Sequence, residues 1–208
     1  MLILSSAYLA PVQYYAHLYA AGRAVEDRYE HYVKQTYRNR CYIATPDGPL
    51  ALTIPVERGG AAGRAMRDMR ISDHGNWRHL HWNALTSAYE SSPYFEYYAD
   101  DFRPLYEHSY RYLVDFNAAL QQTILDLLDL QPQIVQAEAY VENLTGADTD
   151  LRPLLTPKAP AGIDTRFVPR PYWQVFAERT GFLPNLSMAD LLFNMGPESR
   201  LVLKNSLR

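Results

Sequence analysis

Three features that would assign this sequence to a class are scarce or absent. Cys41 is the only cysteine among 208 residues, which excludes an intramolecular disulfide and a cysteine-rich metal site. No stretch of about 18 apolar residues occurs, so we expect no segment that spans a membrane. The net charge of −3 lacks the basic excess of nucleic-acid-binding modules. We therefore expect a cytoplasmic protein with no nucleic-acid partner.

The signatures of common enzyme classes are missing as well. The chain has no Gly-x-Ser-x-Gly nucleophile motif, no Walker loop and no Gly-x-Gly-x-x-Gly fingerprint. No Lys or Arg precedes Arg23, and Pro11 interrupts the apolar opening, which argues against a secretory signal. These absences leave the cofactor unknown, and nothing in the sequence indicates the oligomeric state.

Tyrosine is abundant, with 17 Tyr against 7 Phe. A tyrosine-rich shell around an ordinary core explains this number. The alternative, which the composition favours less, is that many half-buried rings place their hydroxyls toward water or a ligand. Hydrophobic residues make up 48% of the chain, which is enough for a packed core without disulfides.

We predict an α/β fold, with residues 1–208 forming a single domain whose mixed or mostly parallel sheet contains a β-hairpin and is packed by a helical layer. The apolar opening predicts a strand over 2–8, and Pro11 suits the first turn of a helix that runs to Gly22. Residues 24–26 form a weaker second strand. A strand that leads into a helix is typical of α/β folds.

A β-hairpin is the clearest local prediction. Two β-branched, apolar runs over 41–45 and 50–56 flank the turn sequence of 46–49. The alternation over 66–71 predicts another strand, and we expect these strands to share one sheet with 2–8. Gly59, Gly60 and Gly63 are expected to form a flexible link.

A helical layer is predicted over 76–130, because Trp77, His81, Leu85 and Tyr89 recur every fourth residue. Ser72 and Asp73 are candidate N-caps for it.

The C-terminal third is less regular. We expect a strand from Ile134, a Pro-rich surface loop over 143–170 and a last strand over 172–177. Ser187 can cap a helix that continues to Phe193.

The first candidate site is a donor-rich loop that would favour an anion. Its residues are His31, Lys34, Tyr37, Asn39 and Arg40. The alternative is that the cations are solvated surface charges and that Asn39 caps a turn. Strand alternation predicts that Arg40 faces the site and that Arg38 points to solvent.

His81 and Asp190 are candidate catalytic residues. His81 is either a general acid or base, or a half-buried histidine satisfied by a neighbouring hydroxyl. Asp190 either orients a histidine or arginine, or caps the helix that Ser187 begins. His79 and His81 are two residues apart on a helix and point to different faces, so we predict no metal site.

Motifs along most of the chain resemble the WbqC-like family, whose bacterial members are often encoded with genes for polysaccharide and envelope synthesis. There are five such motifs, in this order: residues 8–15; Lys34 together with 37–40; residues 54–56; the series Trp77, His81, Tyr89, Pro93 and Phe95; and Gln174 together with 181–192. Arg28-Tyr29 stands where other members tend to carry an acidic pair. The resemblance implies a role around envelope glycans, and we include Gln13 of the opening motif among the ligand-binding residues.

The leading hypothesis is therefore that the protein is an enzyme that acts on a sugar or phosphate-bearing precursor of an envelope polysaccharide. The candidate enzyme class is a transferase. Lys34 and Arg40 would bind the anion and His81 would transfer protons. The alternative is a non-catalytic binding or scaffold protein that presents its tyrosines to a partner in envelope biosynthesis.

Overall fold

A parallel four-stranded sheet organises the chain in a computed structural model that describes residues 1–57, 63–160 and 162–208. Its strands are β1 (Leu2–Leu4), β2 (Arg23–Glu26), β5 (Gln133–Gln136) and β6 (Thr149–Asp150). They lie in the order β5-β2-β1-β6, and each pairs in parallel with its neighbour. The carboxyl ends of the strands therefore meet at one edge and the amino ends at the opposite edge.

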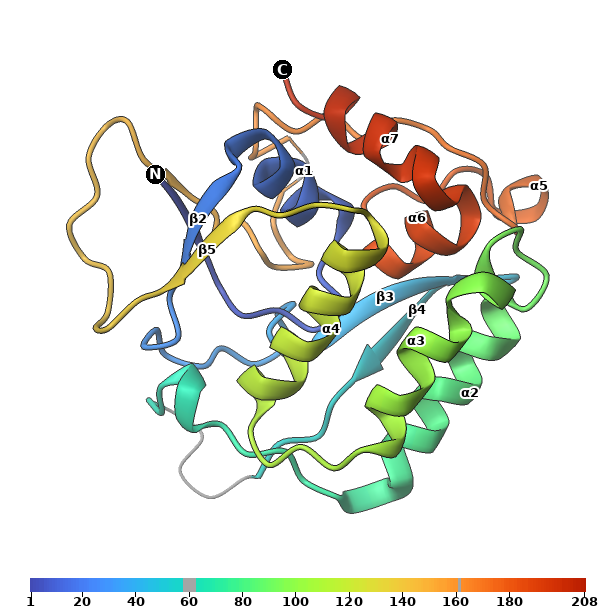
Figure 1. Ribbon diagram of the computed structural model, residues 1–208, viewed down its shortest axis with the longest axis horizontal. Helices are drawn as coiled ribbons and strands as arrows, with labels where there is room; N and C mark the ends of the chain where they lie inside the picture. The colour runs from blue at the N-terminus through green and yellow to red at the C-terminus, as the bar shows by residue number, and fades with distance from the viewer. Residues whose placement is uncertain (58–62, 161) are drawn as a thin grey trace.

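The first crossover follows the predicted strand-to-helix pattern. Helix α1 (Val12–Ala21) begins after Pro11 and connects β1 to β2 (Figure 1). Gly22 ends it with a φ of 61°, a left-handed conformation that glycine adopts without steric cost. The α1 residues from Val12 to Leu18 are all buried, so this helix lies inside the fold rather than on its surface.

The predicted hairpin is confirmed, but it forms a sheet of its own. Strands β3 (Arg40–Thr45) and β4 (Gly48–Thr53) are antiparallel and joined by a two-residue turn. The expectation that the hairpin shares a sheet with β1 is wrong, because β3 packs against α2 and α6 and its Tyr42 carbonyl accepts a hydrogen bond from Ser187 N. The predicted α/β class, with a mostly parallel sheet and a hairpin, is confirmed.

The strand predicted over 66–71 is also wrong. Met66–Asp68 form a 3₁₀ turn, and Met66 and Met69 are both fully buried. A burial period of three residues suits such a turn and not a strand, whose side chains alternate. Gly59 and Gly60 of the predicted link lie outside the described residues.

Three long helices confirm the predicted helical layer. They are α2 (Trp77–Tyr89), α3 (Phe95–Glu107) and α4 (Leu113–Leu127). A 3₁₀ turn over His74–Asn76 precedes α2, so the helix begins after Asn76, and neither Ser72 nor Asp73 caps it. Within the residues that the structure describes, no helix is long and apolar enough to cross a membrane.

The segment 143–170 departs from the predicted surface loop. It supplies β6, and Leu151 and Leu155 are buried in the core. No strand forms over 172–177, all of which the structure describes. The short helix α5 (Ala177–Thr180) begins at the last residue of this range.

The predicted C-terminal helix is present as α6 (Met188–Met195), and the Ser187 hydroxyl accepts a hydrogen bond from Ala189 N as its cap. Helix α7 (Ser199–Asn205) follows and packs against α1.

Candidate functional site

A pocket of about 810 Å³ lies at the carboxyl ends of the parallel strands. We call it the carboxyl-edge pocket. Open parallel sheets bind their ligands in this position, outside the carboxyl ends of the strands. The pocket is lined by Tyr29, Glu30, His31, Val33, Thr36, Arg38, Tyr140, Glu142, Asp150, Arg152, Pro153 and Thr156.

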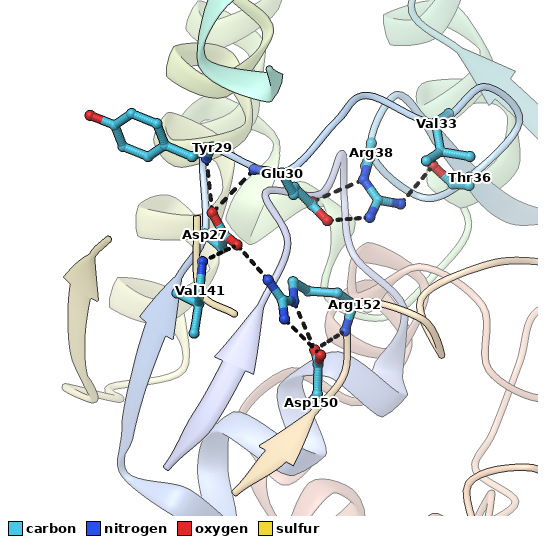
Figure 2. A network of polar contacts seen from close by, with 9 residues as sticks. All are labelled: Asp27, Tyr29, Glu30, Val33, Thr36, Arg38, Val141, Asp150 and Arg152. Atoms are coloured by element: carbon cyan, nitrogen blue, oxygen red, sulfur yellow. Dashed lines mark hydrogen bonds and ion pairs between the residues drawn. The ribbon is translucent and has the colours of Figure 1, made fainter. Parts of the chain in front are cut away.

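Asp27 anchors the polar network beneath this pocket. It directly follows β2 and is completely buried. One carboxylate oxygen, Oδ1, accepts hydrogen bonds from Tyr29 N at 2.9 Å and Glu30 N at 3.1 Å, while Oδ2 accepts from Arg152 Nη1 at 2.5 Å. Figure 2 shows these side chains beyond the arrowheads of the strands. A buried carboxylate is tolerated when donors and a cation surround it in this way.

Arg152 connects Asp27 to the end of β6. Its Nε and Nη2 donate to the two oxygens of Asp150 at 3.0 and 2.8 Å, in a bidentate pair (Figure 2). The guanidinium carbon lies 5.0 Å from the ring centroid of Tyr140, which is a cation–π distance. Arg152 is therefore held by groups from three different parts of the chain.

Arg38 forms the second buried pair, with Glu30. Its Nε donates to Glu30 Oε1 at 2.9 Å, Nη2 donates to Oε2, and Nη1 donates to Thr36 Oγ1 at 3.3 Å (Figure 2). The expectation that Arg38 points to solvent is wrong, because only 5% of the residue is exposed and it lines the pocket. Arg40 instead lies on the hairpin, where its Nε donates to Thr53 Oγ1 at 2.8 Å.

The charges of the pocket are largely neutralised within it. Arg38 and Arg152 are both paired with carboxylates. In contrast, the side chains of His31 and Glu142 make no hydrogen bond or ion pair to the part of the chain that the structure describes. The pocket thus combines a fixed polar floor with two polar side chains, His31 and Glu142, that no described residue holds.

The residues predicted for the donor-rich loop do not converge. His31 lines the pocket, whereas Lys34 is exposed and is not part of the lining. Tyr37 is buried with its ring against Tyr42, and Asn39 donates from Nδ2 to the Ile54 carbonyl at 2.8 Å.

Gln13, predicted from the opening motif, lies outside this pocket. Its side-chain Nε2 donates to Asp164 Oδ2 at 2.6 Å, and its Oε1 accepts from Asn185 Nδ2 at 3.2 Å. A ligand-binding role for Gln13 and for the loop residues stays a prediction.

His81 lies in the core, where two neighbours satisfy its ring. Tyr8 Oη is 2.9 Å from Nδ1, and a hydrogen bond with the Thr53 backbone involves the same imidazole. Burial lowers the pKa of His81 to about 4, so the ring is neutral at pH 7. This geometry matches the structural interpretation of His81, and a catalytic role stays untested.

Asp190 is the first-turn acid of α6 and is also completely buried. Its carboxylate accepts hydrogen bonds from Tyr89 Oη at 2.7 Å, Tyr172 Oη at 2.6 Å and Gln174 Nε2 at 3.0 Å. Burial raises its pKa, and these donors oppose the shift by stabilising the anion. The carboxylate ties 172–174 to the core and does not line the pocket.

Sequence reasoning missed the Asp27 network. A signal for Asp27 existed, because it directly follows the strand predicted over 24–26. No signal existed for Asp150 and Arg152, since they lie within the predicted loop. Among the residues that the structure places, no group of three or more His, Cys, Asp or Glu side chains could hold a metal ion.

Comparison with known proteins shows which family the chain belongs to. The chain is 28% identical over 192 residues to the uncharacterized protein Rv1507c of Mycobacterium tuberculosis, and the match covers 81% of each chain. No solved structure matches. The model of the WbqC-like protein family matches residues 6–154, a range that contains the whole Asp27 network but not Asp190. On this match, the chain belongs to the WbqC-like protein family.

Proposed function

We propose that the chain is an enzyme that acts on a sugar-bearing precursor of a cell-envelope polysaccharide, which it binds in the carboxyl-edge pocket. The observation that carries the proposal is the lining of this pocket, which combines fixed carboxylate–guanidinium pairs with the side chains of Tyr29 and Tyr140. Sugar hydroxyls both donate and accept hydrogen bonds, and the apolar faces of sugar rings pack on aromatic side chains. The polysaccharide context rests on the family resemblance.

The neutralised arginines favour a sugar over a phosphate at the pocket floor. Arg38 directs two of its guanidinium nitrogens to carboxylates and Arg152 directs all three, while Glu30 and Asp150 retain acceptor capacity for hydroxyls. A phosphate group of a precursor would instead lie toward His31, a lining residue whose imidazole N–H can donate to it without breaking an ion pair. This assignment replaces the anion role first expected for Lys34 and Arg40.

Two side chains are available for proton transfer. Glu142 and His31 line the pocket and are unpaired among the placed residues. In a group transfer, one of them would take the proton of a sugar hydroxyl while the hydroxyl oxygen bonds to the group that arrives. The bond from that group to the phosphate of an activated donor would break, and the phosphate would leave with the electron pair. We place this reaction in the cytoplasm, where a free thiol such as Cys41 stays reduced.

A ligand screen tests the binding part of the proposal. Nucleotide sugars and polyprenyl phosphates are added singly, and the melting temperature is measured. A ligand at 100 times its Kd should stabilise the protein by about 2.7 kcal/mol. Failure of every member of the panel to stabilise the protein would contradict the proposal.

Tyr140→Ala ties binding to this pocket. Tyr140 is 51% exposed, so its removal should leave stability nearly unchanged while it weakens binding of the stabilising sugar about tenfold. Tyr97→Ala is the matched control, because Tyr97 is 73% exposed and lies on α3 away from the pocket lining. Equal affinity in both variants would indicate that the ligand binds outside the carboxyl-edge pocket.

A scaffold function is the second candidate, and exposed apolar side chains favour it. Leu80, Tyr97 and Trp173 are 58%, 73% and 53% exposed. Seven of the 17 tyrosines are buried, however, and six more are partly buried and pack against the core, so the tyrosine content mainly builds the core. A stoichiometric protein partner from native extract, together with no ligand from the panel, would favour the scaffold over the enzyme.

A further inference from the structure

A second pocket, of about 490 Å³, lies at the opposite edge of the parallel sheet. We call it the amino-edge pocket. Leu2, Arg23 and Thr149 come from the first residues of β1, β2 and β6, and His17 and Ala21 come from α1. The lining also includes Arg166, Met1, Ala20 and Ala147. The amino-edge pocket is therefore separate from the carboxyl-edge pocket, to which we assign the sugar.

The amino-edge pocket has unpaired positive charge. Arg23 and Arg166 both line it, and neither forms an ion pair with a carboxylate in the described ranges. Arg166 Nη1 donates to Thr149 Oγ1 at 3.1 Å, which points the guanidinium along this edge and leaves its other donors free. No Asp or Glu is among the placed residues of the lining. Such a pocket favours an oxyanion.

A buried histidine forms the wall of this pocket. His17 is 2% exposed, and its Nε2 lies 2.7 Å from Asp164 Oδ2. The same oxygen accepts from Gln13 Nε2 at 2.6 Å, while Oδ1 accepts from Arg166 N at 3.1 Å and Phe167 N at 3.3 Å. These donors fix the carboxylate, and it in turn fixes the orientation of the imidazole.

The pair defines which nitrogen of His17 carries the proton. Burial lowers the pKa of His17, although Asp164 opposes this shift, so the ring is neutral at pH 7. Burial opposes ionisation of Asp164, but the hydrogen bond from Gln13 and the contact with His17 outweigh it and lower the pKa of Asp164, which is therefore an ionised acceptor. Nε2 must then carry the hydrogen, and Nδ1 is left as an acceptor with no partner among the described side chains.

We propose that the amino-edge pocket is a second ligand site, which binds a phosphate oxyanion that carries or adjoins an O–H group. Arg23 and Arg166 bind the phosphate oxygens, and Nδ1 of His17 accepts a hydrogen bond from the O–H. Inorganic hydrogen phosphate and a hydroxyl-bearing phosphate ester both offer this combination. Sulfate has the same charge and shape at pH 8 but lacks an O–H. The proposal is independent of the sugar assigned to the carboxyl-edge pocket.

Imidazole nuclear magnetic resonance tests the site directly. Long-range proton–nitrogen spectra at pH 8 should show His17 with the hydrogen on Nε2. Inorganic phosphate, glycerol 3-phosphate and sodium sulfate are then titrated separately. We expect saturable shifts of the His17 signals with one or both phosphates, and an affinity for sulfate at least about tenfold weaker, because Nδ1 would be left without a donor. Which phosphate binds more tightly identifies the ligand source.

Arg166→Gln should weaken phosphate binding about tenfold, since it removes a charged contact. The side chain is exposed, so the variant should fold normally. Arg103→Gln, whose arginine lies on α3 in an exposed pair with Glu107, is the matched control and should bind as the wild type does.

Three results would overturn the proposal: equal affinity for sulfate and phosphate, no saturable shift with either phosphate, or unchanged binding in Arg166→Gln. A His17 signal with the hydrogen on Nδ1 would also overturn it.

Discussion

Both edges of the parallel sheet carry arginines, yet the arginines differ in what surrounds them. At the carboxyl edge, Arg38 and Arg152 are 5% and 8% exposed and paired with carboxylates. At the amino edge, Arg23 and Arg166 are exposed and line a pocket without a carboxylate in the described chain. A buried cation requires a counter-ion, and that counter-ion removes its attraction for an outside anion. Location in a pocket therefore does not by itself make an arginine an anion-binding residue.

The largest expected difference between the edges is in stability. Arg152→Met would leave the buried Asp27 carboxylate without its cation, which should cost about 3–5 kcal/mol of unfolding free energy. Arg166→Gln should cost less than about 0.5 kcal/mol, because that side chain is exposed. Urea unfolding measures both. Similar losses in the two variants would break the comparison.

Acidification tests the histidine of the amino edge, His17, by comparison with His81, which lies outside both pockets. The folded-state pKa of His81 is about 4, below its unfolded value of about 6.5. The unfolded chain therefore binds the proton first, and the stability that His81 gives above pH 6.5 is lost as the pH falls toward 4. The loss from this residue should approach about 3 kcal/mol.

Burial lowers the pKa of His17 as well, so acid acts on the amino edge with the same sign. Its signal should titrate above that of His81, because Asp164 favours the His17 cation and no carboxylate contributes to the shift of His81. Imidazole titration from pH 8 to pH 4 measures the order of the two histidines. The reverse order would mean that the pair with Asp164 is not formed in solution.

The salt concentration should have the smallest effect of the conditions considered, and it should weaken ligand binding at one edge more than at the other. Phosphate binding at the exposed arginines of the amino edge should weaken several-fold as the Debye length shortens from about 30 Å to about 8 Å. Binding of the free, uncharged sugar that corresponds to the stabilising ligand should change by less than about twofold at the carboxyl edge, because Arg38 and Arg152 are neutralised within the protein. Calorimetry at low and physiological salt measures both affinities. A salt-independent phosphate affinity would indicate that the arginines do not bind the anion.

Sequence patterns predicted the elements that depend on neighbours in the chain. The hairpin over 41–56, the helix that begins after Pro11 and the helical layer over 76–130 all have local turn, cap or periodicity signals. The division into two sheets could not be predicted, because it depends on which helix covers β3.

The same distinction applies to the candidate site. His31 was predicted from its loop and does line the pocket, but Arg38 was assigned to solvent by strand alternation. The strand begins at Arg40, so alternation did not apply to Arg38, and its direction depends on the buried Glu30. Arg152 contacts a carboxylate that precedes it by 125 residues, and no local pattern carries that information.

The 125-residue separation between Asp27 and Arg152 also bears on how the protein is made. A ribosome that has synthesised β1, α1 and β2 has produced the Asp27 carboxylate long before its cation exists. Closing a loop of this length also carries an entropic cost that only the finished contacts offset. We therefore expect the carboxyl-edge pocket to be among the last regions to mature during biosynthesis. A nascent chain that ends before residue 149 lacks β6 as well as Arg152, and it should be recognised by chaperones and proteases rather than by the ligand.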